Sequence, residues 1–266
     1  MGHGAAQPKV AFISGANQGI GRAVATRLAK EYGFAVIIGS RKLPAGQEVA
    51  DELGAAGCTA TAVQLDVTSE ASIAAATAAV AAEYGRLDVL INNAGVFLGK
   101  GTAVFRREEP QLPTRELFER TFGTNVIGVA CLTDALLPLL MRSRGGTSTE
   151  AASSGPPLPR IIFVSSRMGA FSHATDRSTT SWPLDLKAYD ASKAAVNMLA
   201  VNYARILEEV GGSANAVCPG FVSTGMTGFH ASGTPLEAGT QRIVELATGE
   251  NPPTGTFSDK DGPIAW

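Results

Sequence analysis

Two side chains in the C-terminal half could carry proton-transfer chemistry. Tyr189 and Lys193 are four residues apart in Y-D-A-S-K, so a helix over this stretch would place both on one face. An ammonium group beside a phenol favours the phenolate and lowers a pKa that is normally about 10. A tyrosine with such a neighbour is suited to general acid–base catalysis. The alternative is a packing pair, in which the lysine stem covers the ring and its charge reaches water.

Two further polar residues could join this pair. Ser166 follows an apolar run at a predicted strand end, where side chains emerge into the ligand crevice of open α/β sheets. Asn125 lies inside a long predicted helix, although asparagine competes for backbone hydrogen bonds and is a poor helix former. A turn-capping serine and an exposed helix asparagine are the structural alternatives.

A glycine-rich turn near the N-terminus indicates a phosphate-containing ligand. The segment S-G-A-N-Q-G-I-G (14–21) follows an apolar run and opens into a helical pattern. Gly15 allows a tight turn, Gly19 lets the backbone approach a pyrophosphate, and Gly21 permits close packing of the helix. Glycine accounts for 30 of 266 residues, so the strand–turn–helix context, and not glycine alone, predicts a dinucleotide site.

These residues need a scaffold that brings several strand ends together. Short apolar runs alternate with amphipathic patterns along the chain. The predicted strands are Lys9–Ser14, Phe34–Gly39, Thr61–Leu65, Leu87–Asn92, Arg160–Ser165, Ala214–Val217 and Gly255–Phe257. The predicted helices are Gly19–Tyr32, Ala45–Leu53, Ser69–Tyr84, Thr114–Met141, Ala188–Val210 and Pro235–Thr248. The alternation predicts right-handed crossovers and one doubly wound, Rossmann-type α/β domain with a parallel sheet of about seven strands.

The domain is expected to span residues 9–266 after a flexible tail, residues 1–8. Residues 143–159 are rich in Ser, Gly and Pro and predict a mobile surface loop. Residues 167–187 connect a strand to a helix at the carboxyl edge of the sheet. Ligands bind at this edge in such folds, so this second segment is expected to be a substrate loop.

Taken in order, the motifs resemble those of the short-chain dehydrogenase/reductase family. The family's T-G-x-x-x-G-x-G is present with Ser14 in place of the threonine. The other matches are N-N-A-G (92–95), V-S-S-R-M-G (164–169), Y-D-A-S-K (189–193) and P-G-F-V-S-T (219–224). The resemblance covers the chain from about Lys9 to Thr224.

The resemblance implies an oxidoreductase with a catalytic group of Asn125, Ser166, Tyr189 and Lys193. Ser166 would donate a hydrogen bond to the substrate oxygen and Tyr189 would deliver the proton. Lys193 would stabilise the tyrosinate and hold the nicotinamide ribose, and Asn125 would hold a water of the proton relay. The cofactor-binding residues implied are Gly15, Asn17, Gln18, Gly19, Ile20, Gly21, Asp66, Val67, Asn93, Ala94, Gly95, Tyr189, Lys193, Pro219, Gly220, Val222 and Thr224.

The end of the second predicted strand favours NADP(H) over NAD. An NAD-binding enzyme usually has a carboxylate here for the ribose hydroxyls, whereas this chain has Arg41 followed by Lys42. A guanidinium can pair with a 2′-phosphate and stack on adenine. A solvated basic pair on a loop is the alternative. By resemblance, Asp66 caps the adenine amino group and Val67 packs on the ring.

The substrate predicted is a ketone, aldehyde or quinone. The segment between Ser166 and Tyr189 is longer than in most short family members and resembles the carbonyl-reductase branch, as does the closing G-P-I-A-W (262–266). The candidate substrate-binding residues are Ser166, Met168, Phe171, Trp182, Phe221 and Met226. Two alternatives stay open: an imine reductase or redox-neutral cyclase on the same fold, and a non-catalytic dinucleotide sensor, which should lack one of the four catalytic residues.

Composition argues against other partners. A net charge of −2 gives no reason to expect nucleic acid, and no apolar run approaches the roughly 20 residues of a membrane span. The chain has three cysteines and no C-x-x-C, which predicts no metal site. We expect a cytoplasmic protein. Family members associate through two long helices, here Thr114–Met141 and Ala188–Val210, which implies a homodimer or homotetramer unless the added loop obstructs that surface.

Overall fold

The computed structural model describes residues 7–98, 112–142 and 158–266. Most of the predicted N-terminal tail, residues 1–6, and most of the predicted mobile loop, residues 143–157, lie outside the described residues.

The strands form one sheet in the order β3-β2-β1-β4-β5-β6-β7-β8, parallel except for the last pair. The strands are β1 (Val10–Ser14), β2 (Ala35–Ser40), β3 (Ala60–Gln64), β4 (Val89–Asn92), β5 (Arg160–Val164), β6 (Ser213–Val217), β7 (Phe257–Asp259) and β8 (Gly262–Pro263). The doubly wound α/β prediction is confirmed, with a two-residue antiparallel strand added at one edge. The last parallel strand begins later than predicted, because Gly255 turns the chain with a φ of 67°.

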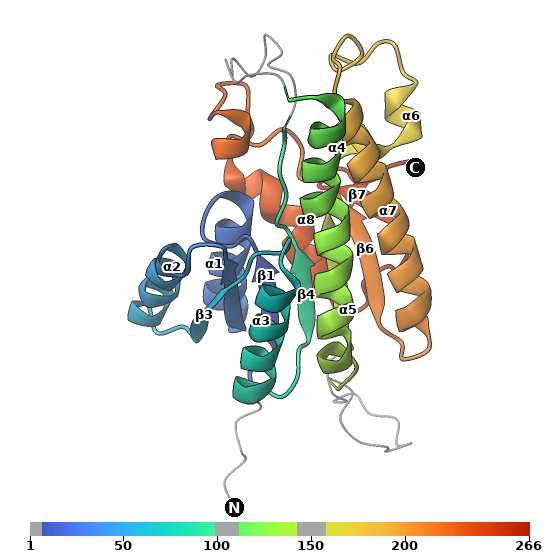
Figure 1. The fold of residues 1–266 in the computed structure, drawn as a ribbon. Coiled ribbons are helices and arrows are strands. Elements are labelled where there is room, and N and C mark those ends of the chain that lie inside the picture. Colours follow the sequence, from blue (N-terminus) through green and yellow to red (C-terminus); the bar gives the residue numbers. More distant parts are fainter. Residues whose placement is uncertain (1–6, 99–111, 143–157) are drawn as a thin grey trace, which may run out of the picture.

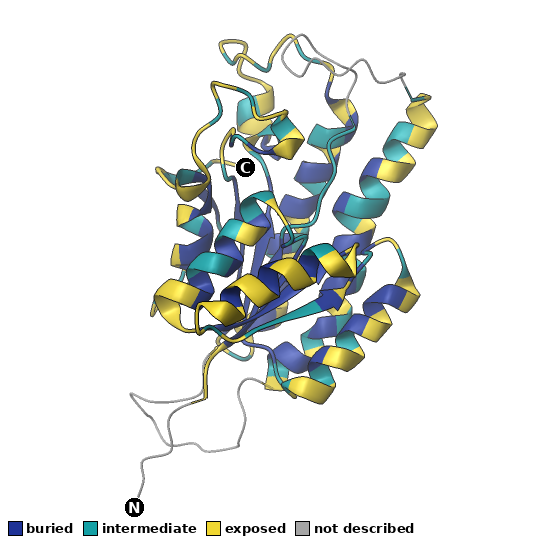
Figure 2. Cartoon of the chain, turned by 90° about the vertical axis from the view of Figure 1, so that its left-hand side faces the viewer, coloured by how far each residue is buried: buried dark blue, intermediate teal, exposed yellow. Residues whose placement is uncertain are grey.

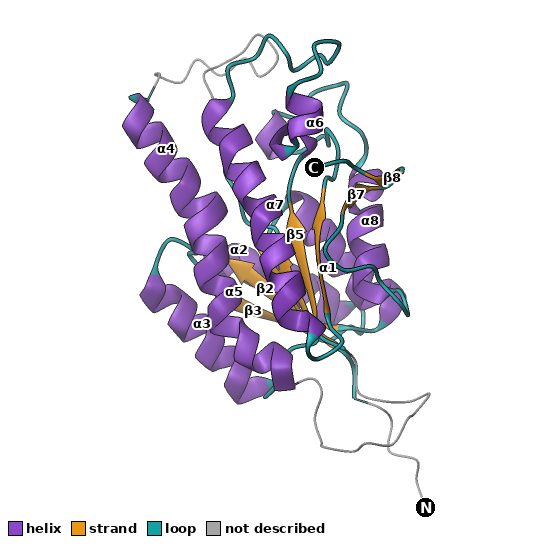
Figure 3. Cartoon of the chain, turned by 90° about the vertical axis from the view of Figure 1, so that its right-hand side faces the viewer, coloured by secondary structure: helices purple, strands orange, loops and turns teal. Residues whose placement is uncertain are grey.

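Helices cover both faces of the sheet (Figures 1 and 3). They are α1 (Gly19–Tyr32), α2 (Leu43–Ala55), α3 (Glu70–Glu83), α4 (Thr114–Phe122), α5 (Gly128–Met141), α6 (Phe171–Ala174), α7 (Lys187–Glu208) and α8 (Leu236–Thr248). Side chains from α3, α5 and α7 share one core cluster, and those from α1, α2 and α8 share the other. Strand residues alternate between the two clusters, so Phe12 belongs to the first and Ile13 to the second, as the pleat requires.

Figure 2 shows the result as buried strands between helices whose outer faces are exposed. Strands β1, β2, β5 and β6 are buried at every position. Their continuous apolar runs are explained by this burial on both faces.

The helix predicted over Thr114–Met141 is interrupted. A π-helical segment, Gly123–Ile127, separates α4 from α5. These 28 residues are long enough for a membrane span and contain an 18-residue window with a mean hydropathy of 1.6, contrary to the expectation from the sequence. In the fold α5 packs against α3 and its Leu132 and Leu136 are fully buried in the core. Core packing therefore accounts for the apolar composition.

Candidate active site

The glycine turn has the backbone that its sequence predicts. Gly15 and Gly19 have φ angles of 66° and 56°, in the left-handed region that favours glycine. A Cβ on Gly21 would lie 2.5 Å from Asn93 Nδ2 and 2.6 Å from the Gly15 carbonyl oxygen. A side chain would therefore be unfavourable at all three positions. At Gly21 it would collide with the neighbouring loop as well as with the turn itself.

The N-N-A-G loop is bonded to this turn. Asn93 Nδ2 donates to the Ser14 carbonyl oxygen at 2.8 Å, and the main-chain nitrogens of Asn93 and Ala94 donate to Ser14 Oγ at 3.0 and 2.9 Å. Ser14 is buried. The hydroxyl that replaces the family's threonine thus joins the carboxyl ends of β1 and β4.

The start of α1 is open to an anionic ligand. Gln18 is its N-cap residue and makes no side-chain cap, and the first turn holds no acidic residue. Backbone N–H groups at a helix N-terminus attract phosphate. Asn17 and Ile20 are half-buried and Gln18 is exposed, so these predicted cofactor residues line the start of this helix.

The predicted adenosine end lies at the ends of β2 and β3. Arg41 is exposed. The pKa of Asp66 is lowered, because its carboxylate accepts hydrogen bonds from Thr68 N at 2.9 Å and Thr68 Oγ1 at 2.7 Å, and because the charge of Arg41 is nearby. The hydrogen bonds are the larger cause. Val67 is 6% exposed and belongs to the core, so little of its side chain faces solvent.

The predicted catalytic side chains converge above the sheet. Ser166 lies beside Tyr189, where its side chain partly offsets the rise that burial causes in the pKa of the phenol. Lys193 Nζ lies 5.6 Å from the Tyr189 ring centroid and donates to the Val164 carbonyl oxygen at 2.9 Å. Tyr189 also meets Phe97 edge-to-face, with ring centroids 4.9 Å apart.

Asn125 completes this group from the π-helical segment. Its Oδ1 accepts from Val96 N at 2.8 Å, and its Nδ2 donates to the Val96 carbonyl oxygen and to Ser192 Oγ, both at 3.0 Å. A Cβ on Gly95 would lie 3.4 Å from Asn125 Oδ1 and 3.7 Å from Lys193 Nζ. Gly95 therefore leaves a narrow space between two of the predicted catalytic residues.

The electrostatics of the tyrosine differ from the sequence prediction. We expected Lys193 to lower the pKa of Tyr189, but that prediction is wrong for the protein alone, because burial raises the pKa and the nearby Cys218 raises it further. Burial also lowers the pKa of Lys193, to about 8, so its ammonium form predominates only below about that pH. Tyr189 is consequently protonated at neutral pH, the state that a proton donor needs.

Two serines at the end of β5 have different surroundings. Ser165 is buried, with its Oγ 2.6 Å from Asn197 Oδ1. Ser166 is half-buried and is the one beside Tyr189. Asn197 and Ser192 were not predicted as site residues. Ser192 Oγ donates to the Tyr189 carbonyl oxygen at 2.7 Å. The helical spacing of both residues from Lys193 and Tyr189 puts them on the same face and could have identified them.

The loop after β6 lies beside the glycine turn. A Cβ on Gly19 would be 3.7 Å from Thr224 Cγ2, so the predicted cofactor residue Thr224 reaches that turn. Pro219 is half-buried and Gly220 bends the chain with a φ of 81°. Val222 is buried against α8, where a Cβ on Gly239 would be 2.4 Å from its Cγ2.

The predicted substrate residues lie on two loops. Met168 follows Ser166 in a 3-10 turn, Arg167–Gly169, and its main-chain nitrogen donates to Ser166 Oγ at 3.2 Å. Phe171 is 75% and Trp182 48% exposed on the segment before α7. Phe221 and Met226 are exposed on the loop after β6. These aromatic residues lie at the surface and not in a described cavity.

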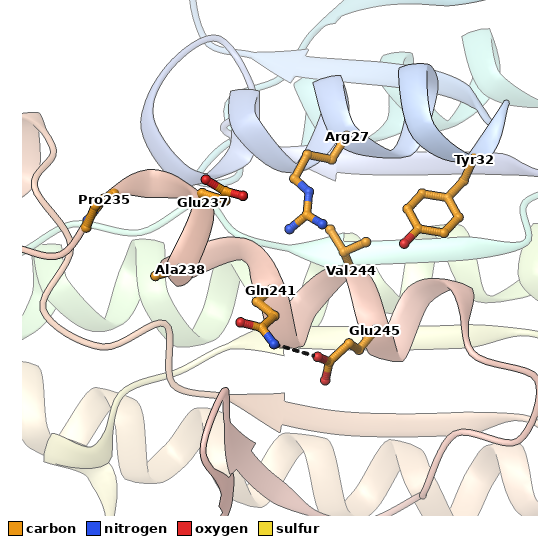
Figure 4. A pocket seen from close by; sticks show the side chains of 8 residues that line it. All are labelled: Arg27, Tyr32, Pro235, Glu237, Ala238, Gln241, Val244 and Glu245. Carbon is orange, nitrogen blue, oxygen red and sulfur yellow. Dashed lines mark hydrogen bonds between the residues drawn. The ribbon is translucent and has the colours of Figure 1, made fainter.

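A cavity of about 470 Å³ lies elsewhere, between α1 and α8 (Figure 4). Its lining residues are Arg27, Tyr32, Pro235, Glu237, Ala238, Gln241, Val244 and Glu245. All of them lie outside the predicted site, so this cavity does not bear on the chemistry above.

The chain matches known proteins along most of its length. The family model described as short chain dehydrogenase matches residues 9–233. A short-chain dehydrogenase/reductase named ATR10 from Stachybotrys chlorohalonatus is 35% identical, covering 97% of this chain and 91% of the relative. Carbonyl reductase (NADPH) 1 of Macaca fascicularis is 31% identical, covering 90% of each chain.

A solved structure agrees with the fold. The NADPH-bound carbonyl reductase from chicken fatty liver has a TM-score of 0.77 and 24% identity, and the match covers 98% of this chain and 100% of that one. The fold and these matches define an oxidoreductase with a Rossmann-type domain. The chain belongs to the short-chain dehydrogenase/reductase family.

Proposed function

We propose that this protein reduces a carbonyl group of a small molecule with NADPH. The observation that carries the proposal is the cluster of Ser166, Tyr189 and Lys193 beside Asn125, at the carboxyl ends of β4 and β5. A dinucleotide sensor would not need four such side chains together. A relative that is 31% identical bears NADPH in its name.

The residues of the site fit a nicotinamide dinucleotide. Gly15 and Gly19 give the turn its backbone, the start of α1 offers uncapped N–H groups, and Gly95 leaves room beside Lys193. Arg41 is the exposed cation for a 2′-phosphate. When bound, the reduced cofactor supplies hydride.

The protein's own residues handle the oxygen of the substrate. Ser166 Oγ donates a hydrogen bond to it, and the Tyr189 hydroxyl transfers its proton as negative charge develops there. Lys193, when protonated, stabilises the tyrosinate that remains. Asn125 is held by Val96 and Ser192, so it joins the π-helical segment to the loop after β4 and to α7, and from there it would hold the water of the proton relay.

The experiment is turnover of NADPH with a panel of ketones, aldehydes and quinones, run beside a matched panel of imines. We expect oxidation of NADPH with the carbonyl panel. Faster turnover of the imines would favour the imine-reductase alternative, and conversion of substrate without NADPH oxidation would favour the redox-neutral cyclase.

The proposal includes a cytoplasmic protein that forms a homodimer or homotetramer and binds neither nucleic acid nor membrane. Three free cysteines, Cys58, Cys131 and Cys218, suit a reducing compartment. Exposed Ile127 and Met198 (59% and 60%) support association through the long helices. Light scattering of the purified protein measures the oligomeric state, and a monomer would contradict this part.

A further inference from the structure

The segment from β7 to the last residue, which we call the β7–β8 segment (257–266), is bonded to the loop that follows Ser166. Ser172 Oγ donates to the Ala265 carbonyl oxygen at 2.6 Å, and Ser172 N donates to the Trp266 main-chain oxygen at 3.3 Å. Ser172 belongs to α6, which lies close to the C-terminus in Figures 1 and 3. Both contacts depend on the path of the β7–β8 segment.

The path of the β7–β8 segment is fixed by contact with a buried core residue, Phe257. The Trp266 ring stacks on Phe257 with centroids 5.5 Å apart and an interplanar angle of 23°, and Phe257 is 2% exposed. Ile264 N donates to the Phe257 carbonyl oxygen at 2.8 Å. The last residues are therefore fixed to β7, and α6 is fixed to them.

A second link joins the β7–β8 segment to the residue next to the predicted catalytic serine. The Arg167 guanidinium forms an ion pair with Asp259, whose side chain is 8% exposed. Arg167 and Ser172 lie on either side of Met168 and Phe171, two of the predicted substrate residues. The β7–β8 segment thus holds this stretch at both ends.

Residues 168–170 are also held by α7 and the core, because Asn197 Nδ2 donates to the Gly169 carbonyl oxygen at 3.2 Å and Ala170 is 1% exposed. From Phe171 onward the stretch has less to define its position. Helix α6 has four residues, and a helix this short is not stable by itself. Phe171 contributes little burial, since it is 75% exposed. Where apolar packing is this small, the polar contacts decide the conformation.

We propose that the β7–β8 segment determines substrate specificity by positioning Phe171 and the loop from α6 up to α7. The inference rests on the proposed function, because it assigns the loop to the substrate side. Ser172, Asp259 and Trp266 are positioning residues that act through this loop and do not touch the reacting atoms.

The test uses the full chain, with NADPH present, and the variants Ser172→Ala and Trp266→Ala. Hydrogen exchange of residues 171–186, the Kd for NADPH, and kcat and KM for ketones of increasing size are measured. We expect faster exchange in 171–186 and a KM raised about threefold to tenfold for bulky ketones, the range for one lost hydrogen bond. The Kd for NADPH and kcat for the smallest ketone should stay unchanged.

Ser178→Ala is the matched control. Its hydroxyl donates to Asp176 inside the same loop at 2.7 Å and leaves the contacts of Ser172 intact. An equal effect of Ser178→Ala would overturn the assignment to the β7–β8 segment. Faster exchange with unchanged KM values would overturn the role in specificity, and unchanged exchange would overturn the positioning itself. If the wild type reduced none of the carbonyls, the proposed function would fail, and the exchange comparison alone would still decide whether Ser172 and Trp266 hold the loop.

Discussion

Beside the glycine turn, the Ser14 hydroxyl and the Asn93 amide are bonded to the backbone. Around the loop after Ser166, in contrast, the aromatic side chains of Phe171 and Trp182 are exposed. Ser14 is 1% exposed and joins two strand ends, while Phe171 is 75% exposed. A buried hydrogen bond is costly to break, but an exposed side chain can change at little cost. From this difference we expect the proposed cofactor side of the fold to be conformationally fixed and the proposed substrate side to tolerate substitution.

The largest expected effect is at the point where the two sides meet. Tyr189→Phe should lower the rate of reduction by about 10²–10⁴-fold, the usual contribution of a general acid, because the hydroxyl that would transfer the proton is removed. The measurement is single-turnover NADPH oxidation with a reducible ketone, together with cofactor titration. NADPH binding should persist, because the ring remains.

Tyr203→Phe on the same helix is the control. The Tyr203 hydroxyl lies outside the proposed site and donates a hydrogen bond of 2.6 Å to Asp134. The variant should turn over like the wild type. Near-native turnover of Tyr189→Phe would contradict the proposed chemistry and make the cyclase or imine-reductase alternative the leading one.

The next effect tests the cofactor side alone. Arg41→Asp replaces the cation proposed for the 2′-phosphate with a repelling charge, and should reduce the preference for NADPH over NADH by about 2–4 kcal/mol. Titration of both cofactors measures it. Arg115→Asp, a charge reversal on α4 at a side chain that is 88% exposed, should leave the preference unchanged. A wild type that binds NADH as tightly as NADPH would show that Arg41 is wrongly assigned.

A smaller effect concerns pH. Burial lowers the pKa of Lys193 from 10.5 to about 8, so its ammonium is lost above that pH and kcat/KM for reduction should fall, by up to about tenfold per pH unit. Stability should change in the opposite direction. Between about pH 8 and 10.5 the unfolded chain binds more protons at this residue than the folded one, so the contribution of Lys193 to stability rises with pH.

The pH profile of kcat/KM and urea unfolding at several pH values measure these two trends. Lys193→Met should remove the contribution of this residue to the rise in stability between about pH 8 and 10.5, because methionine does not titrate. A kcat/KM that stays constant up to pH 10.5 would contradict the lowered pKa of Lys193.

The smallest effect should come from the substrate side. Removing about ten residues from the centre of the 167–187 loop is tolerable in a surface segment, and it should change KM several-fold, or the range of ketones accepted, with NADPH affinity unchanged. Trp182→Ala is a milder version that keeps the loop length. An unchanged substrate profile in both variants would place the loop outside the substrate site.

The sequence predicted the scaffold well for a physical reason. Strands buried on both faces require continuous apolar runs, and these are readable without a structure, as at β2 and β5. The convergence of Ser166, Tyr189 and Asn125 followed from the order of the motifs, one after a strand end and two on helical segments. The roles assigned to these residues stay predictions.

What could not be predicted depends on tertiary contact. The raised pKa of Tyr189 comes from burial, which a four-residue spacing does not reveal. The contacts of Asn125 with Val96 and Ser192, and the link between Ser172 and Ala265, likewise join positions far apart in the chain. The exposure of Phe171 and Trp182 could not be predicted from the sequence, because an aromatic residue in a polar run can face either a pocket or solvent.

The π-helical segment Gly123–Ile127 makes the number of residues in this helix matter as much as their identity. Each residue of an α-helix rotates the chain by about 100°, so deleting one residue here would restore α-helical pairing and turn α4 relative to α5. Asn125 would then leave Val96 and Ser192, or the apolar face of α5 would leave the core. Substitutions elsewhere in the segment keep this register, so homologous genes should vary here in residue type and be intolerant of single-codon insertion or loss.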